Sequence, residues 1–146
     1  MPTYYCTTPR GLLNAAKKAL IAKEITRVHN AVTGAATFFA QVIFSEVAAG
    51  DYFVGGAPLA SDQVFVYGHI RAGRSVVERQ RLVTDLVASL GQAAGVPKHL
   101  VWVYVTELPA RQMAEYGHIL PEPGDEDAWL DGLPATDRKY MLAVGR

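Results

Sequence analysis

Residues 63–107 read QVFVYGHIRAGRSVVERQRLVTDLVASLGQAAGVPKHLVWVYVTE. The pattern of apolar residues over residues 63–70 predicts a strand. Ser75 and Glu78 then have the spacing of a capping box, which marks the start of a helix. An apolar stripe at helical spacing follows: Val77, Leu82, Val83, Leu86, Val87 and Leu90. Three residues are expected to end this helix: Gly91, Gly95 and Pro97. The nearly continuous apolar run over residues 100–107 predicts a second strand, so the stretch is a β-α-β unit.

The same order of elements occurs earlier in the chain. Residues 3–6 form a short strand-like run, and Asn14 is a good N-cap for a helix that ends at Thr33 and Gly34. The apolar stripe of this helix consists of Ala16, Ile21, Ile25, Val28 and Val32. Residues 38–47 alternate as expected for a strand. Three matched pairs are each 61 residues apart: Pro2 and Gln63, Asn14 and Ser75, and Phe39 and Leu100. The sequence therefore predicts two consecutive copies of one β-α-β unit.

Two β-α-β units of equal length predict an α+β fold. The 146 residues suit a single domain, 1–146, with repeat units of about 2–60 and 61–146. Because β-α-β crossovers are right-handed, both helices are expected on one face of a four-stranded mixed sheet. The other face would then be bare although its strands are apolar. We therefore expect self-association through the open face.

The segments outside the repeat have weaker signals. Residues 52–56, with Gly55 and Gly56, predict a hairpin arm between the units. A short helical turn is expected before Glu115, and a last helix over residues 135–144. The acidic cluster is expected to be a solvated surface; it consists of Glu122, Asp125, Glu126 and Asp127. Three apolar residues are expected to anchor this tail on the body or on a neighbouring subunit: Trp129, Leu130 and Leu133.

Composition limits the classes of partner. The formal net charge is zero and 19% of residues are charged, so the long-range attraction that nucleic acids or anionic membranes require is missing. A small anion needs only a local cationic pocket. Cys6 is the only cysteine, which excludes an intrachain disulfide and a cysteine-based zinc site and suits a reducing cytoplasm. No segment reaches the roughly 20 apolar residues of a membrane span, and no signal peptide is evident, so we expect a soluble, cytoplasmic protein.

Pro2 is the first candidate functional residue. Removal of Met1 would expose a secondary amine, which can act as acid, base or nucleophile near neutral pH. Met-Pro is a common chance beginning, so Pro2 alone indicates little. Arg71 and Arg74 strengthen the case, because cations at a helix start oppose the helix dipole and stability alone gives no reason for them. Taken singly, His29 is more often a packing residue and Tyr104 a strand core residue, and Glu115 could cap a helix or form an ion pair.

These groups together suit one kind of chemistry. Two guanidinium groups and an imidazole can hold a carboxylate and draw electron density from a conjugated double bond, which leaves the β-carbon electrophilic. Tyr104 and Glu115 could then orient and deprotonate a water for attack at that carbon. A cationic Pro2 would protonate the α-carbon. No metal or organic cofactor is required.

The same residues resemble the tautomerase superfamily, most closely its cis-3-chloroacrylic acid dehalogenase branch. The resemblance covers nearly the whole chain and includes four local strings: Thr33-Gly34, Gly73-Arg74-Ser75, Val101-Trp102-Val103-Tyr104 and Met113-Ala114-Glu115-Tyr116-Gly117. It implies a homotrimer in which Pro2, Tyr104 and Glu115 are catalytic and His29, Arg71 and Arg74 bind the substrate. It also implies that cis-3-chloroacrylate is converted to malonate semialdehyde and halide.

The charge on Pro2 leaves alternatives open. Burial and the two arginines would lower the pKa of the amine and favour a neutral base, whereas Glu115 would raise it and favour an acid. A neutral Pro2 suits phenylpyruvate-type keto-enol tautomerisation, and a cationic one suits hydration of acetylenic acids and dehalogenation. Specificity is expected in the walls, in residues 33–39, Tyr67 and His69, where residues 35–37 and Tyr67 depart from the dehalogenase pattern. A non-enzymatic trimeric binding protein is the remaining alternative.

Overall fold

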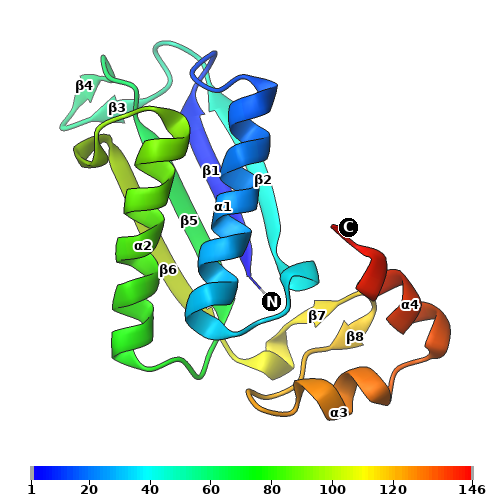
Figure 1. Ribbon diagram of the computed structural model, residues 1–146. Coiled ribbons are helices and arrows are strands. Elements are labelled where there is room, and N and C mark those ends of the chain that lie inside the picture. Colours follow the sequence, from blue (N-terminus) through cyan, green and yellow to red (C-terminus); the bar gives the residue numbers. More distant parts are fainter. Residues whose placement is uncertain (1, 146) are drawn as a thin grey trace.

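The computed structural model describes residues 2–145 and has a four-stranded sheet in the order β2-β1-β5-β6. The strands are β1 (Thr3–Pro9), β2 (Gln41–Val47), β5 (Val64–Arg71) and β6 (Val101–Leu108). β1 pairs parallel with β2 and antiparallel with β5, and β5 pairs parallel with β6. The helices α1 (Ala15–Thr33) and α2 (Val76–Ala94) lie side by side on one face of this sheet (Figure 1). The predicted α+β architecture is confirmed.

The 61-residue repeat is a property of the structure as well as of the sequence. β1 and β5 begin 61 residues apart, and both ends of α1 and α2 keep the same offset. Two 3-10 helices, η1 (Thr37–Phe39) and η2 (Lys98–Leu100), also correspond. The predicted strand starts at residues 38 and 100 were therefore wrong. In η1 the amide N–H of Phe39 donates to the Ala36 carbonyl, so the chain turns before β2 begins.

Helix caps and apolar stripes agree with the prediction at most positions. The Asn14 side chain accepts from the Lys17 amide at 2.8 Å, and Ser75 and Glu78 form the predicted capping box. Gly34 and Gly95 end α1 and α2 in the left-handed conformation. Two details differ. Val77 is 73% exposed because it lies in the first turn of α2, and Gly91 lies inside the helix, where an added Cβ would meet the Val96 carbonyl at 3.1 Å.

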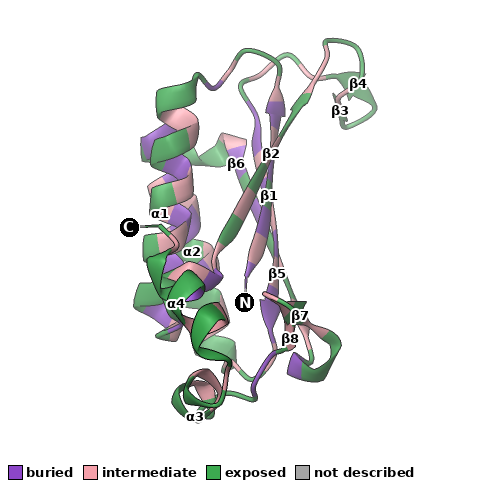
Figure 2. Cartoon of the chain, turned by 90° about the vertical axis from the view of Figure 1, so that its right-hand side faces the viewer, coloured by how far each residue is buried: buried purple, intermediate pink, exposed green. Residues whose placement is uncertain are grey.

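The main core lies between the sheet and the two helices. It consists of alternate strand side chains and the inner stripes of the helices, among them Tyr4, Cys6, Val64, Val66, Ile21, Ile25, Leu82, Leu86 and Leu90. No helix of the described chain covers the opposite face of the sheet (Figure 2). Exposed residues on that face include Tyr5, Ile43, Trp102 and Tyr104. Self-association through this face stays a prediction.

The tail folds against the Pro2 end of the sheet (Figure 1). After η3 (Ala110–Gln112) it forms β7 (Ala114–Glu115), β8 (His118–Ile119), α3 (Glu126–Asp131) and α4 (Ala135–Ala143). A second cluster contains Ala35, Phe39, Ala110, Leu120 and Met141, with Trp129, Leu130 and Leu133 packed against it. The predicted anchoring of the tail and the last helix are confirmed, whereas the β7–β8 hairpin and α3 were not predicted.

The segment between the two units forms the predicted hairpin, with β3 (Phe53–Val54) paired antiparallel to β4 (Ala57–Pro58). Within residues 2–145 no helix combines the length and apolar character needed to cross a membrane.

Candidate active site

The topology brings the start of β1, the end of β5, the end of α1 and the start of α2 to one end of the sheet (Figure 1). Pro2 directly precedes β1 and is buried, and its carbonyl accepts from the Gln41 amide at 2.9 Å. His29 lies in the last turns of α1, Arg71 ends β5 and Arg74 precedes α2. Four of the six predicted site residues therefore gather at this end.

His29 is buried and neutral. Burial lowers its pKa to about 3, and the charge of Arg74 contributes to the shift. Its Nδ1 is 2.8 Å from the hydroxyl of Tyr4, whose pKa burial raises. Because the buried phenol has no other hydrogen-bond acceptor in the described chain, its proton goes to Nδ1, which places the imidazole N–H on Nε2. Tyr4 was not predicted from the sequence, since 25 residues separate it from His29.

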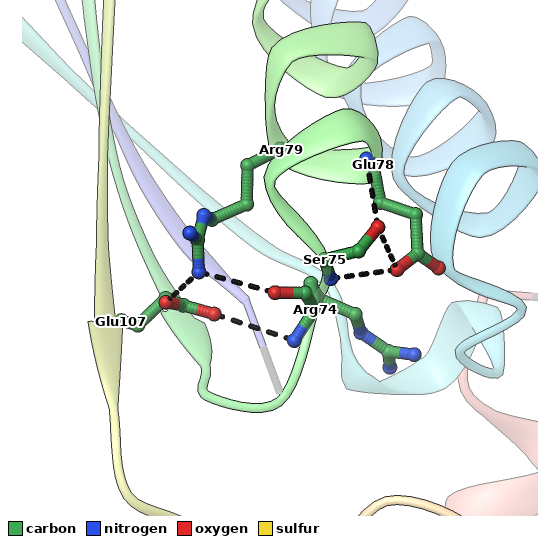
Figure 3. A network of polar contacts seen from close by, with 5 residues as sticks. All are labelled: Arg74, Ser75, Glu78, Arg79 and Glu107. Carbon is green, nitrogen blue, oxygen red and sulfur yellow. Dashed lines mark hydrogen bonds and ion pairs between the residues drawn. The ribbon is translucent and has the colours of Figure 1, made fainter.

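The backbone of Arg74 is fixed by hydrogen bonds, whereas its side chain has no partner among residues 2–145. Its amide N–H donates to Glu107 at 3.4 Å, and its carbonyl accepts from Arg79, which is also ion-paired with Glu107 (Figure 3). The side chain extends away from this network (Figure 3). Its guanidinium makes no hydrogen bond or ion pair with any other residue that the structure describes. A cation held in this way is available to an anionic ligand.

Arg74 lines a cavity of about 350 Å³, which we call the Arg74 cavity. One wall is formed by residues 33–36 with Phe38 and Phe39, whereas Tyr67 and His69 of the expected specificity region do not line it. The opposite wall comes from the tail, from Gly124, Glu126, Asp127, Trp129 and Leu130. The tail therefore contributes to the candidate site, which the sequence did not indicate.

Arg71 is only 2% exposed, and its guanidinium is bound by residues of the tail. Its Nη1 donates to the Pro121 carbonyl at 2.6 Å and its Nη2 forms an ion pair with Glu126. Its Nε has no partner among residues 2–145. Burial raises the pKa of Glu126, but the hydrogen bond from Arg71, the backbone hydrogen bonds to the carboxylate and the charge of Arg71 together outweigh it, and the pKa is lowered. The prediction of a solvated acidic cluster was wrong for Glu126, because it compensates a buried charge.

Glu115 lines a second, larger cavity of about 770 Å³, which we call the Glu115 cavity. Thr3, beside Pro2, also lines it, and Phe38 and Phe39 border both cavities. Tyr116 occupies the left-handed region (φ 54°) at the turn between β7 and β8, and its hydroxyl donates to the Phe38 carbonyl at 2.5 Å. This bond joins the hairpin that carries Glu115 to Phe38, which borders both cavities.

Tyr104 lies away from the four residues that gather at the Pro2 end of the sheet. It lies on the open face, 54% exposed, with its ring 5.1 Å from that of Phe65. Its register partner on β5 is Tyr67, and the partner of Tyr67 on β1 is Tyr5. Tyr104 therefore lies two strands away from β1, at the level of a residue three positions after Pro2. Strand spacings of about 4.8 Å and rises of about 3.3 Å per residue put its Cα about 14 Å from that of Pro2. Tyr67 and His69 lie on the same face, and both contact Thr106.

These features define a double β-α-β protein with a cavity lined by Arg74 at the end of the sheet where the buried Pro2 lies. A family model described as "Putative oxalocrotonate tautomerase enzyme" matches residues 1–132. The chain belongs to this family, in the tautomerase superfamily, and specifically to its cis-3-chloroacrylic acid dehalogenase branch.

Solved structures support this assignment. The protein N1, a member of the cis-3-chloroacrylic acid dehalogenase (cis-CaaD) family, is 31% identical with a TM-score of 0.93, over 96% of this chain and 98% of its own. Native Ps01740 is 28% identical with a TM-score of 0.72, over 77% of this chain and 99% of its own. A wild-type fused 4-OT asymmetric trimer is 20% identical with a TM-score of 0.74, over 80% and 94%, and shares the fold. No curated protein matches the chain.

Proposed function

We propose that this protein adds water to 3-substituted acrylates without a cofactor, converting cis-3-chloroacrylate to malonate semialdehyde and chloride with Pro2 as general acid. The observation that carries the proposal is Arg74, which lines a cavity at the Pro2 end of the sheet and whose guanidinium has no partner among the described residues. A neutral His29 with its N–H on Nε2 adds a hydrogen-bond donor. Together they suit one small carboxylate.

The proposed reaction follows from these groups. Arg74, Arg71 and His29 hold the carboxylate and stabilise the negative charge that develops on it as the double bond is polarised. Glu115 accepts a proton from water while the water oxygen bonds to C3, and the π electrons move towards C2 and the carboxylate. The Pro2 ammonium then protonates C2. The resulting 3-chloro-3-hydroxypropanoate loses chloride and a proton to give the aldehyde.

Tyr104 takes part in this proposal through a second copy of the chain. Its position on the open face, about 14 Å from Pro2, keeps it from acting within its own subunit. An assembly that covers the open face, such as a homotrimer, would deliver it to a neighbour's site. A fused 4-OT of the same fold has been solved as a trimer, which supports this arrangement.

Mixing two inactive variants tests the role of Tyr104. Pro2→Ala and Tyr104→Phe are each expected to lose most activity, and subunits of the two refolded together are expected to regain part of it. The mixed assembly would contain some sites with both an intact Pro2 and an intact neighbouring Tyr104. Absence of recovery in an assembly shown to be mixed would contradict a Tyr104 supplied by a neighbour.

The second candidate is a phenylpyruvate-type keto-enol tautomerase, or a hydratase of acetylenic acids, in which dehalogenation is a side activity. Burial of Pro2 and the charge of Arg74 favour the tautomerase, because both lower the pKa of an adjacent amine and so favour a neutral base. The third candidate is a non-enzymatic trimeric binding protein.

Proton NMR distinguishes the candidates. Protein shown by mass spectrometry to lack Met1 is incubated with cis- and trans-3-chloroacrylate, propiolate and phenylpyruvate. We expect the fastest turnover with cis-3-chloroacrylate. Faster turnover of phenylpyruvate would favour the tautomerase, and faster turnover of propiolate would favour the hydratase. Turnover of none of the four would exclude all three activities and leave the binding protein.

A further inference from the structure

Arg71 and Arg74 stand three residues apart, but their charges are not equally available. The Arg74 guanidinium is unpaired in the described chain, whereas that of Arg71 is paired with Glu126. Because Arg71 is only 2% exposed, water cannot replace Glu126 as the partner of its guanidinium. The two arginines and Glu126 therefore carry a combined charge of +1, not the +2 that the sequence suggests.

Glu126 is positioned to affect a bound ligand as well as Arg71. It lines the Arg74 cavity and is the one residue of α3 that also contacts the Arg71 guanidinium. Its carboxylate also accepts a hydrogen bond from the Gly124 amide at 2.8 Å. A negative charge held at the wall of a partly buried cavity is weakly screened, so it acts on whatever the cavity contains.

We propose that Glu126 sets the carboxylate site to a single positive charge and thereby selects monocarboxylates over dicarboxylates. This inference rests on the proposed function, in which Arg71 and Arg74 hold the substrate carboxylate. One carboxylate neutralises Arg74, and a second one in the same cavity would meet Glu126 and Asp127, with no other cation among the described residues that line the cavity. The substrate class is thus a short acid whose far end is uncharged.

Arg71 keeps a role in this arrangement. Its Nε is buried and has no partner in the part of the chain that the structure describes, so it is a donor that lacks an acceptor. With Nη1 and Nη2 held by Pro121 and Glu126, the orientation of this N–H is fixed. Arg71 acts as an oriented, charge-compensated hydrogen-bond donor, while Arg74 supplies the net charge.

Maleate and cis-3-chloroacrylate test the proposal, because both are cis acids and differ in carrying a carboxylate or a chlorine at C3. Their dissociation constants are measured by NMR titration above neutral pH, where both maleate carboxyl groups are ionised, and every protein compared, the wild type included, carries Pro2→Ala so that cis-3-chloroacrylate is not turned over. Wild-type protein is expected to prefer cis-3-chloroacrylate. In Glu126→Gln the preference is expected to shift towards maleate by about tenfold, the order of effect of one charge at a partly buried site.

Glu122→Gln is the matched control. It is the same substitution in the same segment, and Glu122 is also paired with an arginine, Arg111 at 3.6 Å, but that pair is exposed and lies outside the Arg74 cavity. Its preference is expected to equal that of the wild type. An unchanged preference in folded Glu126→Gln, or an equal shift in Glu122→Gln, would overturn the proposal.

A double variant covers the case in which Glu126→Gln does not fold, since it leaves the Arg71 charge buried and unpaired. Arg71→Met with Glu126→Leu removes both charges and leaves the net charge at +1. It is expected to bind both acids more weakly but with the wild-type preference, and a shift of tenfold towards maleate would overturn the proposal. Loss of the proposed function is distinguishable, because then Arg74→Ala would bind cis-3-chloroacrylate as well as the wild type does.

Discussion

The two β-α-β units have the same elements at the same spacing, but they contribute different groups to the proposed chemistry: the first supplies Pro2 and His29, and the second supplies the arginines. Pro2 corresponds to Gln63, and His29 corresponds to Leu90, an apolar core residue. Gln63 is buried and its Nε2 has no hydrogen-bond partner within residues 2–145. Caps and apolar stripes are therefore enough to build a unit, whereas function depends on a few positions at one end of the sheet. Substitutions at matched positions can test this difference.

Pro2→Ala is expected to have the largest effect, a fall in kcat/KM for cis-3-chloroacrylate of about 10²-fold or more, as for loss of a positioned general acid. A chain that keeps Met1 should also be inactive, because its Pro2 nitrogen is an amide that cannot ionise. Gln63→Ala, at the matched position, should leave kcat/KM within about twofold. Equal losses in the two variants would mean that the Pro2 substitution acts through folding.

Arg74→Ala is expected to raise KM by about 10- to 100-fold, the usual worth of a hydrogen bond to a charged group. Arg10, which stands 61 residues before Arg71 in the first unit, is exposed and provides the control. Arg10→Ala should leave KM unchanged in the same steady-state assay. An Arg74→Ala enzyme with a normal KM would show that the carboxylate is bound elsewhere.

His29 is expected to make stability depend on pH. Its pKa of about 3 in the folded protein lies below the ordinary value of about 6.5. Between these two pH values the unfolded chain binds a proton at His29 and the folded chain does not. Stability should be full above about pH 6.5 and fall towards pH 3 by up to about 1.4 kcal/mol per pH unit. Urea unfolding of His29→Gln should lack this dependence.

The exposed His99 serves as the control for that measurement. His99→Gln should unfold with the same pH dependence as the wild type. If His29→Gln and the wild type lose stability in parallel on acidification, then His29 is not held neutral in the folded protein.

Gln63→Met is expected to have the smallest effect, an increase in stability of about 1 kcal/mol with unchanged activity. The substitution removes a buried amide that lacks a partner and keeps a side chain of similar length. Urea unfolding measures the change. A loss of stability instead would mean that this amide is satisfied, for example by a buried water, and that the second unit also depends on a polar group at this position.

The repeated part of the fold could be predicted from the sequence because its signals are local. Asn14, Ser75 and Glu78 cap their helices through neighbours within three residues, and the apolar stripes have the helical period. The 61-residue offset then extended the prediction from one unit to the other. The strand starts were misplaced because Phe38 and Phe39 are apolar in a 3-10 turn, where alternation has no meaning.

The β7–β8 hairpin, α3 and the side-chain pairs of the site could not be predicted, because their contacts are distant in the sequence or their elements are very short. Two-residue strands such as β7 and β8 show no period. The pairs Tyr4–His29 and Arg71–Glu126 are 25 and 55 residues apart, and nothing in the acidic cluster singles out Glu126. The sequence therefore showed which charged residues to consider but not which of their charges are already compensated.

The central claim is that the Pro2 amine is a proton donor. Glu126 bears on it, because pairing with Arg71 removes one of the two cationic charges that would otherwise lower the pKa of the amine. The most direct test is a titration of the Pro2 nitrogen by ¹⁵N NMR in protein that lacks Met1. The account predicts that the amine is still protonated at neutral pH. An amine that has already lost its proton there would be a base, and would contradict the proposed dehalogenase in favour of a tautomerase.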